Sequence, residues 1–301
     1  MPRALLPSGI ELEYDTFGSP ADPTLLLVAG FTAQMTSWED GFCRLAADHG
    51  YHVVRFDNRD CGLSTKLDGV RCDGMAAMAA VIAGTPLPEV PYTLSEMAAD
   101  GIGLLDHLAV GRAHAVGASM GGMIVQHMAI EFPDRLHSVT SVMSTVGDLA
   151  YGTPTEEAVE VLLSPPPPSR DEYIAGAERY AVWSSKRYFD AVAARLRAAA
   201  DYDRAFYPEG ASRQLAAVYA SGDRTAALRE VRVPMLVMHG LDDTLIHPSG
   251  GRRTAELVPG ATLIEIEDMG HDRPEPLWPV IVGAIVRHAE AATITGIEVA
   301  S

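Results

Sequence analysis

The chain has 301 residues, a formal net charge of −17 at pH 7 and 48% hydrophobic residues. Because binding to phosphates requires Lys and Arg, this excess of carboxylates argues against nucleic acids and acidic membrane surfaces as partners. The length allows one large domain or a domain with an insertion, and the apolar content is sufficient for a substantial core.

The amino terminus and the cysteines indicate a cytoplasmic protein. The sequence MPRALLPSGI lacks the basic start and the apolar core of a signal peptide, and we expect no apolar stretch of membrane-spanning length and no membrane insertion. Cys43, Cys61 and Cys72 fit neither a disulfide framework nor a CxxC motif. We therefore expect unpaired thiols in a reducing compartment, and Cys61 has no adjacent basic partner that would make it reactive.

Strand patterns begin the chain and alternate with a helix pattern. Residues 3–18 alternate apolar and polar positions around the turn at 7–9, which predicts a β-hairpin. We expect buried strands at TLLLVAG, which ends at Gly30, and at HVVRFD, which ends at Asp57. Between these two strands, residues 38–50 have the apolar spacing of a helix.

The same alternation continues further along the chain. Residues 94–111 predict a helix with Ser95 as its N-cap, followed by a strand at AHAVGAS. Further strands are expected at LHSVTSVMST, MLVMHG and ATLIEIE, and a last helix at residues 276–291. Strands alternating with helices predict an α/β fold with a mostly parallel, doubly wound sheet.

The alternation is interrupted at residues 147–228, which contain the proline run SPPPPSR and then helical patterns without a convincing strand. We interpret this segment as a helical cap inserted into a core domain formed by residues 1–146 and 229–301, with the proline run as a stiff connection. A smaller insertion covers residues 71–92.

The pentapeptide GASMG at 117–121 has the form G-x-S-x-G and lies where a strand pattern changes to a helix pattern. Such a turn would project the Ser119 hydroxyl above the strand ends, and the helix beginning at Met120 would direct free N–H groups to the same place. The pentapeptide alone is equally compatible with a serine in a glycine-rich turn, because a hydroxyl is a poor nucleophile without a base.

A base and an acid follow in the expected order. MLVMHGLDDTLIHP is a strand followed by Asp242 and Asp243, and LIEIEDMGHDRPEP is a strand followed by a loop that carries His271. Ser, Asp and His, each after the carboxyl end of a strand, would meet at one edge of an open α/β sheet. A structural loop histidine is the alternative reading of His271.

Five stretches in this order resemble the α/β-hydrolase superfamily over almost the whole chain: VAGFTAQMTSW, VVRFDNRDCGLST, AVGASMGG, VPMLVMHGLDDTLIHP and MGHDRP. Within the superfamily, the chain resembles the aclacinomycin methylesterase-like carboxylesterases. The resemblance implies an α/β-hydrolase fold with an inserted helical cap, a serine nucleophile, and hydrolysis of a small-molecule ester without a cofactor.

The resemblance also implies roles for individual residues. In this family the acid usually lies three residues after the glycine that ends its strand, here Gly240, which favours Asp243 over its neighbour Asp242. Some members place the acid after the preceding strand, so Asp148 is the reserve candidate. With Ser119 and His271, Asp243 would complete a catalytic triad.

Two backbone amides, those of Phe31 and Met120, are the candidates for the oxyanion hole. Many relatives carry His-Gly after the corresponding strand, whereas this chain has Ala29 before Gly30. The missing histidine affects the outer support of the loop, but the donor itself is a backbone group.

The stretch DNRDCGLS departs from the commoner family pattern because Asp60 occupies a position where Gly is usual. We interpret it as a structural loop in which Arg59 binds nearby backbone. His239, His247 and His271 lack the spacing of known metal-binding motifs, so we expect no metal and no cofactor.

The same triad leaves several activities open. A perhydrolase, an amide hydrolase or a C–C hydrolase would use it, and a hydrolase-fold receptor could retain it without turnover. The segment from 147 to 229 holds seven of the ten tyrosines, which predicts either a pocket for a bulky apolar or aromatic ester or packing between cap helices. The oligomeric state, including a homodimer, stays open.

Overall fold

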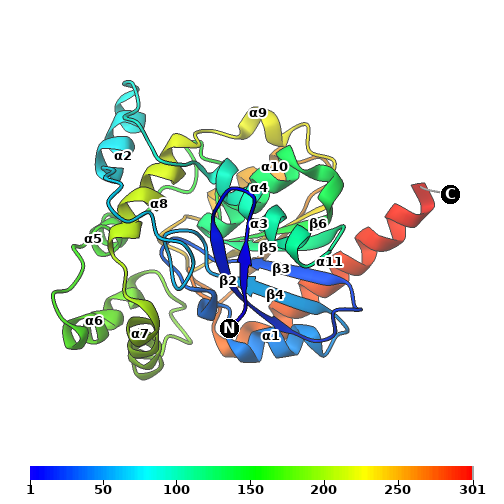
Figure 1. The fold of residues 1–301 in the computed structure, drawn as a ribbon, viewed down its shortest axis with the longest axis horizontal. Helices are drawn as coiled ribbons and strands as arrows, with labels where there is room; N and C mark the ends of the chain where they lie inside the picture. Colours follow the sequence, from blue (N-terminus) through cyan, green and yellow to red (C-terminus); the bar gives the residue numbers. More distant parts are fainter. Residues whose placement is uncertain (300–301) are drawn as a thin grey trace.

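The computed structural model describes residues 1–299, and their side chains through residue 294. Within that range, eight strands form one sheet in the order β1-β2-β4-β3-β5-β6-β7-β8 (Figure 1). The strands are β1 (Arg3–Leu5), β2 (Glu11–Phe17), β3 (Thr24–Val28), β4 (His52–Phe56), β5 (Ala113–Ala118), β6 (Leu136–Val142), β7 (Met235–Gly240) and β8 (Thr262–Ile266).

The strand pairing confirms the predicted hairpin and the mostly parallel sheet. β1 pairs with β2 and β2 pairs with β4 in antiparallel register, whereas every pairing from β4 through β8 is parallel. The carboxyl ends of β3 to β8 therefore share one edge of the sheet, where ligands of open α/β folds bind.

Helices cover both faces of the sheet. Successive side chains of β3 point to opposite faces of the sheet, and both faces are buried. On one face, Leu25 and Leu27 pack in an apolar cluster with α1 (Asp40–Ala47) and α11 (Trp278–Val299). The other face carries Leu26 and packs against three helices, namely α3 (Leu94–His107), α4 (Met120–Glu131) and α10 (Ser249–Leu257).

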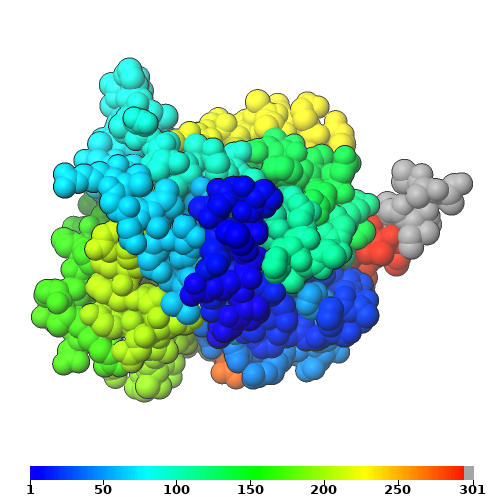
Figure 2. Space-filling model, viewed as in Figure 1, coloured from blue at the N-terminus to red at the C-terminus, as the bar shows by residue number. Residues whose placement is uncertain are grey.

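The residues between β6 and β7, 143–234, form helices joined by loops and are called the inserted segment here. They form α5 (Glu156–Leu162), α6 (Arg170–Gly176), η3 (Ala177–Val182), α7 (Ala191–Ala205), α8 (Glu209–Ala220) and α9 (Thr225–Leu228). Helix α2 (Gly74–Ala83) packs against α8 and projects from the surface at the upper left (Figures 1 and 2). The division into a core and a cap at residues 147–228 stays a prediction.

The amino-terminal cap of α3 differs from the prediction. Thr93, and not Ser95, is the N-cap: the Thr93 side chain accepts from the helix backbone, and the Glu96 side chain accepts from the Thr93 N–H at 2.8 Å. This reciprocal pair is a capping box, which satisfies two amides that the helix itself cannot satisfy. The Ser95 hydroxyl instead donates to Glu131 at 2.5 Å.

The last helix is longer and more apolar than predicted. Within the described residues, 275–294 is the segment long and apolar enough to cross a membrane, with a mean hydropathy of 1.2, so the expectation of no such stretch was wrong. Its inner face is buried, since Ile281, Ile285 and Ala289 are each at most 3% exposed in the cluster that also holds strand residues. These contacts are those of a core helix covering the sheet.

Replacement of His114 by Asn is expected to flatten the acidic side of the stability profile. His114 is 2% exposed, and burial, with the nearby His137 and His288, lowers its pKa from 6.5 to about 3. In the unfolded chain the His114 imidazole binds a proton near pH 6.5, whereas in the folded chain it stays neutral. The free energy of unfolding therefore falls as the pH drops below 6.5, by at most about 1.4 kcal/mol per pH unit.

Urea unfolding between about pH 7 and pH 5 measures the effect as a difference in slope between His114→Asn and the wild type. Asn keeps a polar partner for Ser138 Oγ, which lies 2.8 Å from His114 Nδ1. Identical slopes for the two proteins would contradict the prediction.

Candidate active site

Ser119 occupies a sharp corner between β5 and α4. Its backbone has φ 58° and ψ −122°, a conformation that residues with a side chain rarely adopt. Glycines permit the corner: a Cβ on Gly117 would lie 2.0 Å from the Gly121 carbonyl oxygen, and one on Gly121 would lie 2.1 Å from the Val28 carbonyl oxygen. The Ser119 N–H donates to the Val142 carbonyl at 2.9 Å, which anchors the corner to the end of β6.

The structure brings the three predicted side chains into one hydrogen-bond chain. His271 Nδ1 lies 2.7 Å from Asp243 Oδ2, and His271 Nε2 lies 2.9 Å from Ser119 Oγ, although Ser119 and His271 are 152 residues apart. A carboxylate only accepts hydrogen bonds, so Nδ1 carries the proton and Nε2 is free to accept from the serine hydroxyl. The three residues follow β5, β7 and β8, at the same edge of the sheet.

Asp243 is buried and its carboxylate is fully engaged. Oδ1 accepts from the backbone N–H groups of Leu245 and Ile246, both at 2.9 Å, and Oδ2 lies 3.3 Å from His239 Nε2 in addition to His271. Burial alone would raise the pKa of Asp243, but the neighbouring His271 and the hydrogen bonds from the two histidines lower it to about 2. The group therefore stays ionised at neutral pH.

The two other candidate acids lie elsewhere. Asp242 accepts from the Lys186 backbone N–H at 3.0 Å and lies 3.2 Å from its Nζ. Asp148 accepts from the Ala150 N–H within its own turn, at 3.0 Å. Neither carboxylate contacts His271, so the geometry favours Asp243 as the partner of the imidazole.

The loop that carries His271 is held by the inserted segment. The His271 N–H donates to the Trp183 carbonyl at 2.6 Å, and Asp272 Oδ1 accepts from the Ser185 N–H at 3.0 Å. A Cβ on Gly270 would lie 2.3 Å from the same Trp183 carbonyl oxygen, which shows how closely the two backbones approach. Sequence reasoning missed these contacts because they join segments far apart in the chain.

The loop after β3 lies against the serine. A Cβ on Gly30 would be 3.2 Å from Ser119 Cβ and 3.7 Å from its Oγ. The Thr32 N–H is occupied, because it donates to Gln214 Oε1 at 2.8 Å, whereas the Phe31 N–H has no acceptor among the described residues. Ser119 also leaves the first amides of α4, including that of Met120, without a side-chain cap. Both predicted donors are thus available to a ligand oxygen.

The loop DNRDCGLS is held mainly by charged side chains, and Arg59 also binds nearby backbone as expected, since its Nη2 donates to the Glu96 carbonyl at 3.5 Å. Arg59 forms a buried bidentate pair with Asp100, at 2.6 and 2.7 Å. Asp60 has φ 62° and binds both Arg213 nitrogens that face it, each at 2.8 Å. Cys61 is buried and donates to the Thr32 carbonyl at 3.2 Å, and burial raises the pKa of its thiol, as expected for a structural cysteine.

The three histidines considered as metal ligands have other partners. His239 Nε2 lies 2.7 Å from the Ile246 carbonyl oxygen, and His247 Nδ1 lies 3.0 Å from Ser249 Oγ. Among the described residues, no group of three or more His, Cys, Asp or Glu side chains is arranged to hold a metal ion.

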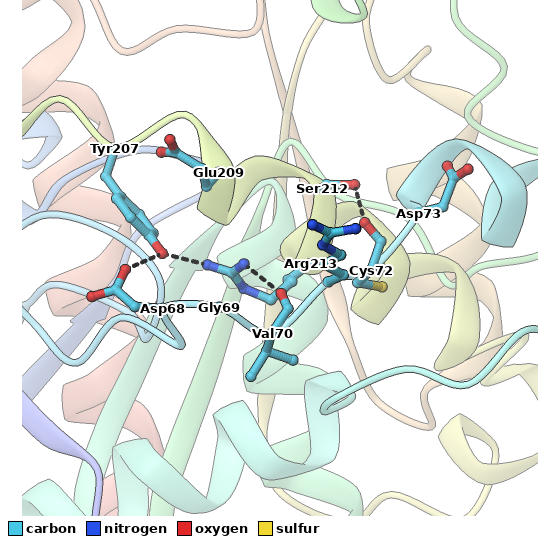
Figure 3. A pocket seen from close by; sticks show the side chains of 10 residues that line it. Asp68, Gly69, Val70, Cys72, Asp73, Tyr207, Glu209, Ser212 and Arg213 are labelled. Carbon is cyan, nitrogen blue, oxygen red and sulfur yellow. Dashed lines mark hydrogen bonds between the residues drawn. The ribbon is translucent and has the colours of Figure 1, made fainter.

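A cavity of about 680 Å³ opens between residues 68–73 and the beginning of α8 (Figure 3). Three of its polar side chains are hydrogen-bonded to one another: Tyr207 donates to Asp68 at 2.8 Å and accepts from Arg213 at 2.7 Å. No residue of the Ser119 hydrogen-bond chain lines it, so this cavity is separate from the candidate active site.

Comparisons with known proteins agree with this fold. The family model described as alpha/beta hydrolase fold matches residues 23–273. The chain is 29% identical to Rhodomycin D methylesterase DnrP of Streptomyces peucetius and 28% identical to Rhodomycin D methylesterase DauP of Streptomyces sp. (strain C5), in both cases over 97% of this chain and 99% of the relative.

Among solved structures, the enol-lactonase from Burkholderia xenovorans LB400 matches with a TM-score of 0.73 and 22% identity, covering 95% of this chain and 99% of that one. The likeness to methylesterases predicted from the sequence is confirmed, and the relatives support a hydrolase of the esterase kind. With the family model matching most of its length and the parallel sheet in place, the chain belongs to the alpha/beta hydrolase fold family.

Proposed function

We propose that the protein hydrolyses a carboxylic ester of a small apolar or aromatic molecule through an acyl-enzyme intermediate on Ser119. The proposal is carried by one observation, the unbroken hydrogen-bond chain from Asp243 through His271 to Ser119 Oγ. In this arrangement His271 Nε2 is placed to accept the proton of the Ser119 hydroxyl, and Asp243 holds the proton on Nδ1. The methylesterase relatives support an ester as the substrate.

In the first step, His271 Nε2 accepts the Ser119 proton while Oγ attacks the ester carbonyl carbon. The buried carboxylate of Asp243 keeps the imidazole in the productive tautomer and stabilises its positive form. The carbonyl oxygen becomes an oxyanion that accepts from the Phe31 and Met120 amides. Each such donor typically contributes about 3–4 kcal/mol of transition-state stabilisation.

The intermediate then collapses. The bond to the alcohol oxygen breaks, and His271 returns its proton to that oxygen, so the alcohol leaves neutral and the acyl group stays on Ser119. In the second half, His271 accepts a proton from water as the water oxygen attacks the acyl carbon. A second oxyanion forms at the same two amides. Its collapse breaks the bond to Ser119 Oγ, His271 returns the proton to that oxygen, and the carboxylic acid is released.

Aromatic side chains of the inserted segment support an apolar or aromatic substrate. The rings of Tyr180 and Trp183 stack with centroids 5.4 Å apart, and the Trp183 carbonyl binds the His271 N–H. Other aromatic residues of the inserted segment pack on one another, since the Tyr202 and Phe206 rings stack at 4.4 Å. Within the proposal, the first pair contributes to substrate choice and the second stabilises the segment.

Ser119→Ala is expected to lower kcat/KM for p-nitrophenyl acetate by about 10,000-fold or more, because no other hydroxyl is activated by His271. Ser95→Ala is the matched control, since the Ser95 hydroxyl contacts Glu131, away from the proposed triad. Initial rates at several substrate concentrations give both constants. Equal rates for Ser119→Ala and the wild type would refute the serine mechanism, and a wild type that turns over no ester would favour a binding protein.

Asp243→Asn is expected to reduce kcat by about 10,000-fold, because an amide presents its NH₂ group or a neutral oxygen to His271 Nδ1 and no longer fixes the tautomer. Asp242→Asn removes the adjacent carboxylate, which contacts Lys186 and not the base, and is expected to retain near-normal kcat. A greater loss in Asp242→Asn than in Asp243→Asn would reverse the assignment of the acid.

A further inference from the structure

We propose that Gln214, on helix α8 of the inserted segment, is a positioning residue for the oxyanion hole. The inference rests on the proposed function, in which the Phe31 N–H is one of two oxyanion donors. It adds that the inserted segment acts in the chemical step, because one of its side chains holds the backbone next to that donor.

Gln214 is fully buried and bridges two loops at the active-site edge of the sheet. Its Oε1 accepts from the Thr32 N–H at 2.8 Å, and its Nε2 donates to the Arg59 carbonyl oxygen at 2.9 Å. Thr32 lies in the loop after β3 and Arg59 in the loop after β4. A buried amide with both ends bound to backbone fixes the distance between these loops.

The position of Thr32 controls the position of the Phe31 amide. The two residues are consecutive, and Thr32 has φ 54°, a left-handed conformation that costs free energy for a β-branched residue. The hydrogen bond from its N–H to Gln214 offsets that cost. Because oxyanion donors act only when they are already aimed at the developing charge, a loop held in one conformation is part of the catalytic arrangement.

The other contacts of this loop do not replace Gln214. Asn58 Nδ2 donates to the Ala29 carbonyl oxygen at 3.0 Å, and Cys61 donates to the Thr32 carbonyl oxygen at 3.2 Å. These contacts hold carbonyl groups and leave the Thr32 N–H to Gln214.

A neighbouring helix reinforces the same loop from the inserted segment. Gln34 Nε2 donates to the Asp201 carbonyl at 2.6 Å and to the Ala205 carbonyl at 3.2 Å, both at the end of α7. Gln34 Oε1 accepts from Arg204 at 2.6 Å. Residues 30–34 are thus fastened to α7 and α8, and docking of these helices on the core positions the proposed donor.

The test compares Gln214→Met with the wild type. Met has a similar length and removes both hydrogen bonds. Ser212→Ala is the matched control on the same helix, because the Ser212 hydroxyl bridges the Gly74 N–H at 2.9 Å and the Cys72 carbonyl at 2.8 Å, away from the oxyanion loop. Gln214→Glu keeps an acceptor for the Thr32 N–H and, as the protonated acid that burial beside the Arg59 carbonyl favours, a donor for that carbonyl, so it tests rescue.

Three quantities are measured: kcat and KM for p-nitrophenyl acetate, and Ki for a small trifluoromethyl ketone, whose adduct with Ser119 carries an oxyanion. For Gln214→Met we expect kcat to fall by about 10- to 100-fold and Ki to rise by a similar factor, with KM nearly unchanged, since loss of a whole donor costs about 100- to 1000-fold. Gln214→Glu is expected to recover most of the loss, and Ser212→Ala to behave as the wild type.

A folded Gln214→Met protein with wild-type kcat and Ki would overturn the inference. The same holds if Gln214→Glu is as impaired as Gln214→Met, because the Thr32 contact would then not be the operative one. If Gln214→Met does not fold, Gln214→Asn, one methylene shorter, is measured against the same expectations. The proposed function fails separately, through equal activity of Ser119→Ala and the wild type.

Discussion

The buried negative charge of Asp243 is the feature on which the rest of the candidate site depends. A carboxylate without water is costly unless it is fully hydrogen-bonded, and two backbone amides together with His271 satisfy it here. Its charge orients the imidazole, and the imidazole in turn faces the Ser119 hydroxyl at 2.9 Å. The parallel order β5-β6-β7-β8 makes this possible, because it places the ends of three separate strands at one edge.

The inserted segment contributes to every part of that edge. The Trp183 carbonyl holds the loop of His271, Gln214 holds the loop after β3, and Arg213 holds Asp60. These contacts are directional hydrogen bonds to backbone or charged groups, so they specify positions more sharply than apolar packing does. We infer that substrate selection and transition-state stabilisation both depend on the inserted segment, the first through Tyr180 and Trp183 and the second through Gln214 on α8.

Local patterns predicted the sheet and the serine corner, because strand ends and glycine-flanked turns are encoded by neighbouring residues. The choice of Asp243 over Asp242 came instead from the resemblance to the α/β-hydrolase superfamily. Contacts between distant segments were missed: nothing in the local sequence pairs Arg59 with Asp100, or Gln214 with Thr32. Asp60 was the available signal, since a buried carboxylate requires a charged partner, which is Arg213.

Covalent labelling tests the central claim most directly. The folded protein is treated with a p-nitrophenyl alkylphosphonate, and the site of attachment is identified by intact mass and peptide mapping. If His271 and Asp243 activate one hydroxyl, a single phosphonyl group attaches to Ser119 and unfolding the protein beforehand abolishes the reaction. Attachment to another residue, or the absence of a reaction with the folded protein, would contradict the account.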